Sequence, residues 1–123
     1  MDSSDRPTEI LIDGPRPQVE RRRLEEAASG SRDWVVITDR PGHHPSGAPP
    51  RGGILVSTKP VTEAVKVVDG LRITGSVDRS DLVEVVVPVV LDRATLVRVL
   101  AGSGDPVDVV AGVAACGGPV VPV

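Results

Sequence analysis

The sequence is poor in aromatic residues: its 123 residues include no Phe, no Tyr and a single Trp. Aromatic side chains usually dominate the energetics of protein cores, because each buries a large apolar area. In this chain that burial must come from small β-branched side chains, which favour pleated strands. The composition therefore predicts a sheet-centred domain with a modest core. We expect Trp34 to be the largest side chain in that core, whereas an exposed Trp34 would indicate a binding hot spot.

Cysteine, net positive charge and long apolar runs are also scarce. The single cysteine, Cys116, excludes an intramolecular disulfide and fits a reducing compartment. The formal net charge of −3 excludes an overall basic footprint for nucleic acid. No apolar run approaches the roughly 20 residues of a membrane helix, and the acidic start Met1–Asp5 is unlike a signal peptide. With its frequent Val, Ala, Gly, Pro, Arg and Asp, the sequence predicts a bacterial cytoplasmic protein that does not bind membranes.

The length suits a single domain covering residues 1–123. The pattern predicts an α+β fold with a small, mainly antiparallel sheet, two or three short helices and a C-terminal strand-helix-helix unit. Residues 1–7 read as a disordered tail. Residues 39–53, rich in Pro, Gly and His, read as a long loop of the kind that is usually functional or disordered.

Turn residues and apolar runs divide the chain into further elements. A hairpin is expected around Asp69-Gly70, with a three-residue loop that pairs Val67 with Leu71. The other expected strands span residues 8–13, 33–38, 54–57, 82–91 and 120–123, and the expected helices span 18–28, 92–101 and 105–116.

The segment Leu82–Leu91 is the strongest predicted strand, and both of its faces are apolar beyond Glu84. Pro88 cannot donate a ladder hydrogen bond, so it belongs on an edge strand or at a bulge. An edge strand with two apolar faces needs a cover, which a partner chain could supply. We therefore expect an interface formed by the strand and its following helix. Its candidate residues are Val86, Pro88, Val90, Leu96 and Val97.

The order strand, helix, Gly turn, helix in residues 85–116 resembles, in outline, the ribbon-helix-helix family of DNA-binding dimers. The resemblance implies that Val86, Pro88 and Val90 would face the DNA. None of these side chains can hydrogen-bond a base edge. A protein-binding or dimerising use of the same outline is therefore favoured over DNA binding.

The loop 39–53 supplies the alternative site. Its candidate ligand-binding residues are Asp39, Arg40, His43, His44 and Arg51. The two adjacent histidines could hold a metal together with Asp39 or Cys116, but adjacent histidines on a flexible loop rarely converge on one ion. We therefore assign no metal ligand and no cofactor, and the sequence shows no catalytic motif.

These patterns lead to one function and two alternatives. The favoured function is a non-enzymatic interaction or regulatory module that assembles with itself or with a larger protein partner through the 82–91 strand. The first alternative is a small ligand- or metal-binding protein or enzyme that uses the 39–53 loop. The second is a DNA-binding regulator, although the composition disfavours nucleic acid as a partner.

Overall fold

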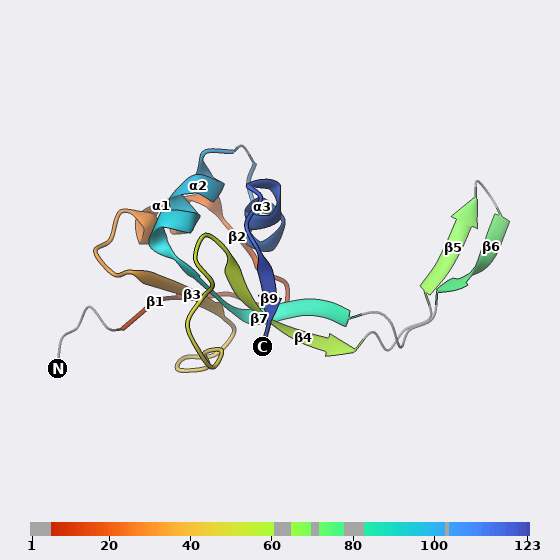
Figure 1. The fold of residues 1–123 in the computed structure, drawn as a ribbon, viewed down its shortest axis with the longest axis horizontal. Helices are drawn as coiled ribbons and strands as arrows, with labels where there is room; N and C mark the ends of the chain where they lie inside the picture. The colour runs from red at the N-terminus through yellow and green to blue at the C-terminus, as the bar shows by residue number, and fades with distance from the viewer. Residues whose placement is uncertain (1–5, 61–64, 70–71, 78–82, 103) are drawn as a thin grey trace.

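The computed structural model describes residues 6–60, 65–69, 72–77, 83–102 and 104–123, and Figure 1 shows their arrangement. Helices and strands are mixed along the chain rather than grouped. The strands are β1 (Thr8–Leu11), β2 (Gln18–Val19), β3 (Trp34–Thr38), β4 (Ile54–Pro60), β5 (Val65–Asp69), β6 (Arg72–Val77), β7 (Val83–Asp92), β8 (Val107–Asp108) and β9 (Val120–Pro122). The helices are α1 (Arg21–Ala28), α2 (Arg93–Leu100) and α3 (Val109–Ala115).

The main sheet has five strands in the order β1-β3-β7-β4-β9. β1 is parallel to β3 and β4 is parallel to β9, whereas β7 is antiparallel to both of its neighbours. Four strands therefore run in one direction, and the central strand runs in the other. The predicted small, mainly antiparallel sheet is wrong. Parallel neighbours are joined by long crossovers, such as the one through α1 between β1 and β3, and the apolar pattern within a strand does not reveal its partner.

The Val-rich strand β7 lies in the middle of the sheet, between β3 and β4, and not at an edge. Pro88 is accommodated by a bulge, because the register against β4 shifts between Val56 and Ser57. The Val87 N–H donates to the Pro15 carbonyl at 2.8 Å, and the Ser57 hydroxyl donates to the Pro88 carbonyl at 2.7 Å. The predicted position of this strand at an edge of the sheet is therefore wrong. A proline within a strand is compatible with either an edge or a bulge, and this chain uses the bulge.

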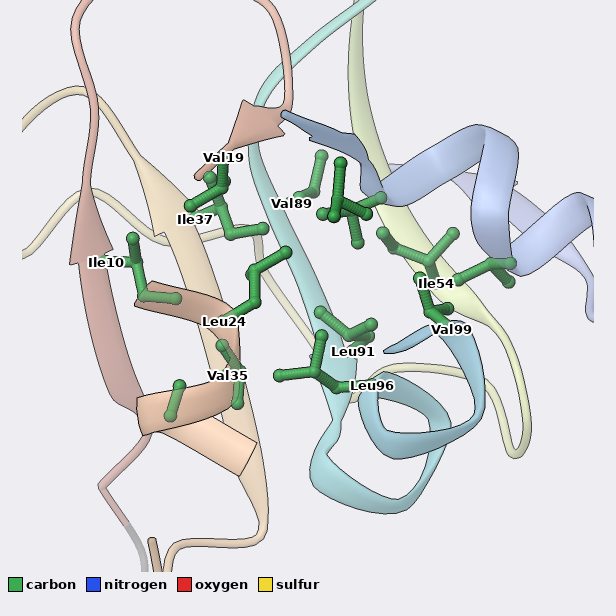
Figure 2. Packing of buried hydrophobic residues seen from close by; sticks show 14 of the residues in the cluster. Ile10, Val19, Leu24, Val35, Ile37, Ile54, Val89, Leu91, Leu96 and Val99 are labelled. Carbon is green, nitrogen blue, oxygen red and sulfur yellow. The ribbon is translucent and has the colours of Figure 1, made fainter. Parts of the chain in front are cut away.

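All three helices cover one face of this sheet (Figure 1). Leu24 of α1 and Leu96 of α2 are fully buried in one cluster with Val35, Ile37 and Leu91 of the strands. Figure 2 shows these aliphatic side chains meeting between the helices and the sheet. Burying each of these leucines stabilises the fold by about 1.5–3 kcal/mol. Aliphatic residues therefore supply the core that aromatic residues usually provide.

A row of paired residues crosses the face of the sheet that the helices leave open. Glu9 pairs with Val36, Val36 with Val90, Val90 with Leu55, and Leu55 with Val121. Directly paired residues project to the same side of a sheet. The three central members form a second buried cluster, separate from the main core.

The connection between β3 and β4, residues 39–53, is here named the strap. It leaves the end of β3, contacts Glu9 on β1 through His44, and returns to the start of β4. This path takes it across the helix-free face. At its far end the backbone is closely packed, because a Cβ added to Gly118 would lie 2.2 Å from the Gly52 carbonyl oxygen. The strap contains no helix or strand, and His44 ties it to the sheet.

Strands β5 and β6 form a separate two-stranded hairpin, drawn away from the main sheet in Figure 1. The hairpin itself is confirmed, but its register is not the expected one. Asp69 pairs with Arg72, and the register shifts inside β5, between Val67 and Val68. The expected pairing of Val67 with Leu71 is wrong, since the irregularity lies within the strand and not at the turn. Gly70 and Leu71 lie outside the described residues.

Two smaller expectations also change. Trp34 begins β3 and is 38% exposed, so it does not fill the core; its role as a hot spot stays a prediction. The helices expected at 18–28 and 105–116 begin later, because β2 and β8 first pair with each other, Gln18 opposite Asp108. Of the predicted tail, residues 1–5 lie outside the described residues. Within the described part, no helix has the length and apolar character that crossing a membrane requires.

Candidate functional site

Charged side chains follow β1 and β3 at one edge of the main sheet. Leu11 pairs with Thr38 at the ends of these parallel strands, and the Ile12 N–H donates to the Thr38 carbonyl at 2.9 Å. Asp13 and Asp39 come directly afterwards. In open α/β sheets, ligands bind outside the carboxyl ends of the strands. We refer to this region as the carboxyl edge.

Thr38 shapes the turn that leaves β3. Its side chain is fully buried, and its hydroxyl lies 3.4 Å from the Arg40 N–H and 3.2 Å from the Arg40 carbonyl, accepting from the first and donating to the second. These contacts place Asp39 and Arg40 together at the surface, where their side chains form an ion pair of 3.8 Å. The Arg40 side chain remains 69% exposed. A guanidinium in this state can bind a carboxylate or a phosphate through two parallel hydrogen bonds.

Glu9 on β1 holds the strap. Its Oε2 accepts a hydrogen bond from the Gly42 N–H at 2.9 Å, and His44 Nε2 donates to the same oxygen at 2.6 Å. The hydrogen bond from His44, and then that from Gly42, keep the pKa of Glu9 below its usual value of 4.5. Glu9 is not among the site residues predicted from the sequence. The available signal was the single carboxylate within β1, next to Ile10 and Leu11.

Two surface hollows lie near charged residues. One, of about 310 Å³, runs between β1 and α1 and is lined by Glu9, Arg23 and Glu26 among others. Arg23 joins the two elements that border this hollow, because its guanidinium on α1 donates to the Leu11 carbonyl of β1 at 2.5 Å. The second hollow, of about 380 Å³, lies between α2 and α3 and includes Arg98. Of the two, only the first adjoins the strap and the carboxyl edge.

The helix N-termini are occupied by carboxylates. Asp92 caps α2 by accepting from the Thr95 N–H at 2.7 Å, and Asp108 caps α3 by accepting from the Ala111 N–H at 3.0 Å. At the start of α1, Asp105 accepts from the backbone N–H of the first helical residue at 3.1 Å. A helix N-terminus is a common phosphate site, but a phosphate at any of these three would meet an aspartate. Side chains are therefore the better anion ligands in this fold.

The predicted loop residues are only partly brought together. Asp39 and Arg40 are paired, the His43 N–H donates to the Arg40 carbonyl at 3.2 Å, and His44 contacts Glu9. Arg51 is exposed, just before β4 begins, which places it at the opposite edge of the sheet.

The possible metal site is not assembled. The Cys116 thiol lies 3.8 Å from the Arg98 carbonyl, on the helical side of the sheet, and His44 is engaged with Glu9. In the part of the chain that the structure describes, no three His, Cys, Asp or Glu side chains come close enough to hold a metal ion.

The predicted interface residues are largely inside the molecule. Val90 and Leu96 are 2% and 0% exposed, Pro88 is buried and Val86 is half-buried, whereas Val97 is 49% exposed. Both edges of β7 pair with strands of the same chain. It therefore cannot form the two-stranded ribbon that the ribbon-helix-helix outline implied, and that interpretation is wrong.

Comparison with known proteins identifies neighbours by fold. No family model matches the chain, and no curated protein matches it. Solved structures do match, among them the crystal structure of 4-diphosphocytidyl-2C-methyl-D-erythritol synthase, with a TM-score of 0.54, and that of 2-C-methyl-D-erythritol 4-phosphate cytidylyltransferase from Thermus thermophilus, with a TM-score of 0.57. The likeness is one of fold. Each structure is 23% identical to this chain and covers 84% of it, while the chain spans only 54% and 55% of theirs.

The comparison corrects the predicted function. Both neighbours are named as enzymes that handle a cytidylyl group, which conflicts with a non-enzymatic interaction or regulatory module. The physical basis of that prediction is also absent, because β7 is central and covered. The prediction of a protein or homo-oligomeric partner is not tested by these observations and stays a prediction.

Proposed function

We propose that this chain is a domain of a nucleotidyltransferase, and that a phosphorylated substrate binds at its carboxyl edge with Arg40 as a phosphate ligand. The observation that carries the proposal is the exposed Arg40 guanidinium beside the ends of two adjacent parallel strands. The fold likeness supports the reaction class, since both neighbours are named for cytidylyl transfer or its product.

The charge distribution supports the choice of Arg40. The three helix N-termini are engaged by aspartates, so an anion needs a cationic side chain. At the same edge Lys59 is already paired with Glu84 at 3.5 Å. Arg40 is paired with Asp39 only at 3.8 Å, which leaves most of its donors open to a phosphate.

Binding measurements test this proposal. We expect calorimetric titration of the purified chain with CTP in the presence of Mg²⁺, and separately with 2-C-methyl-D-erythritol 4-phosphate, to give saturable binding of at least one ligand. Hydrogen bonds to charged groups contribute about 1.5–3 kcal/mol. Arg40→Ala should therefore weaken binding by roughly 10- to 100-fold.

A matched control is Arg32→Ala. Arg32 lies at the opposite edge of the sheet, where its guanidinium contacts the backbone carbonyls of Arg6 and Pro7 at 3.4 Å. This variant should bind as tightly as the wild type. Absence of binding for both ligands, or equal affinities for Arg40→Ala and Arg32→Ala, would exclude the proposed site. Pyrophosphate release with both ligands present measures the reaction itself, and Arg40→Ala should reduce it.

A further inference from the structure

We propose that Glu9 is a positioning residue for Arg40: it clamps the strap through Gly42 and His44, and this clamp places the Arg40 guanidinium at the carboxyl edge. The inference deepens the proposed function and rests on it for the role of Arg40. The clamp itself is a feature of the free protein and can be measured without any ligand.

The clamp acts on the turn that contains Arg40. Thr38 fixes the turn from β3, and the His43 N–H closes it on the Arg40 carbonyl at 3.2 Å. Gly42, inside this turn, has a φ of 75°, a conformation that favours glycine. Its N–H points to Glu9 Oε2 at 2.9 Å. The turn is thus held from two adjacent strands, and its position depends on the carboxylate of Glu9.

His44 adds a second hydrogen bond to the clamp. Its Nε2 lies 2.6 Å from the oxygen that also receives the Gly42 N–H, and the side chains of His44 and Glu9 are only 34% and 27% exposed. The other charged groups near this pair are Arg23 and Glu26 of α1, which line the same hollow, and Asp39 and Arg40 at the start of the strap, together with the neighbouring imidazole of His43.

The dependence of the clamp on pH follows from the Glu9 carboxylate. Glu9 must be ionised to accept both bonds, and its pKa is lowered by them. Its contribution is therefore present above the usual value of 4.5 and is lost as the pH falls through the lower folded value.

NMR of the ligand-free chain tests the clamp. We expect the Gly42 amide signal of the wild type to titrate at acid pH, below the usual Glu value of 4.5, as Glu9 becomes protonated. In Glu9→Gln this titration should be lost, whereas His44→Ala keeps the carboxylate and should keep the titration. In both variants hydrogen exchange at Gly42 should rise by roughly two- to fivefold, the range of an exposed ion pair. The matched controls are Glu26→Gln and His43→Ala, which should leave Gly42 unchanged.

A second measurement tests positioning. Affinity for CTP should fall by about two- to fivefold in Glu9→Gln at about pH 6.5, and its pH dependence should become flatter than in the wild type and in His43→Ala. An unchanged Gly42 titration in Glu9→Gln would overturn the clamp. Faster hydrogen exchange at Gly42 in Glu9→Gln, with the affinity for CTP and its pH dependence unchanged, would overturn the positioning role. Failure of Arg40→Ala to weaken binding would instead reject the proposed function, whatever the Gly42 titration shows.

Discussion

The pair Leu96 and Val97 gives the sharpest test of the fold, because these neighbours on α2 differ completely in burial. Leu96 is fully buried against the sheet, whereas Val97 is 49% exposed. Both would be expected to matter if α2 formed an interface. In the structure only Leu96 belongs to the core cluster. Leu96→Ala removes buried methyl groups and leaves a cavity, which costs about 2–5 kcal/mol of unfolding free energy.

Urea denaturation followed by far-ultraviolet circular dichroism measures this difference. With a slope of about 2 kcal/mol/M, Leu96→Ala should lower the midpoint by about 1–2.5 M. Val97→Ala should stay within about 0.5 kcal/mol of the wild type, as is usual for an exposed position. Leu96→Met, which conserves volume, should lose less than about 1.5 kcal/mol. Equal losses for Leu96→Ala and Val97→Ala would refute the placement of α2.

Two further changes probe the close packing and the capping that the structure shows. Gly118→Ala would put a Cβ 2.2 Å from the Gly52 carbonyl oxygen, so thermal unfolding should show a loss of about 1–3 kcal/mol in the free energy of unfolding. The control is Gly102→Ala, whose Cβ would lie at an ordinary 3.4 Å from its nearest neighbour and which should be nearly neutral. A larger loss for Gly102→Ala than for Gly118→Ala would contradict the packing. Asp92→Ala removes the acceptor for the Thr95 N–H and should cost about 1 kcal/mol in urea denaturation, while an unchanged midpoint would argue against the cap.

Individual elements were more predictable from sequence than their pairing. The strand around Val36 and the helix around Leu96 begin and end within one residue of the bounds that the apolar pattern and the capping residues predicted. The sheet order was not predictable, because Pro88 fits an edge strand as well as a bulge. Only the contacts of Val87 and Pro88 with Pro15 and Ser57 decide between the two.

The site was predictable only where its members are adjacent in the chain. Asp39, Arg40 and His44 stand in one unusual loop, and composition alone singled them out. Glu9 comes from a different strand, and nothing in the sequence links it to His44. The link is created by the parallel pairing of β1 with β3, which was itself not foreseen.

The central position of β7 has a consequence for how the protein is made. On the ribosome, β3 and β4 emerge well before the strand that separates them, since residue 36 must meet residue 90. At roughly 5–20 residues per second, about 3–10 s pass between the emergence of Val36 and that of Val90, and until then β3 and β4 lack the strand that joins them. Yield in a heterologous host should therefore depend on translation speed and on chaperones that shield nascent apolar segments.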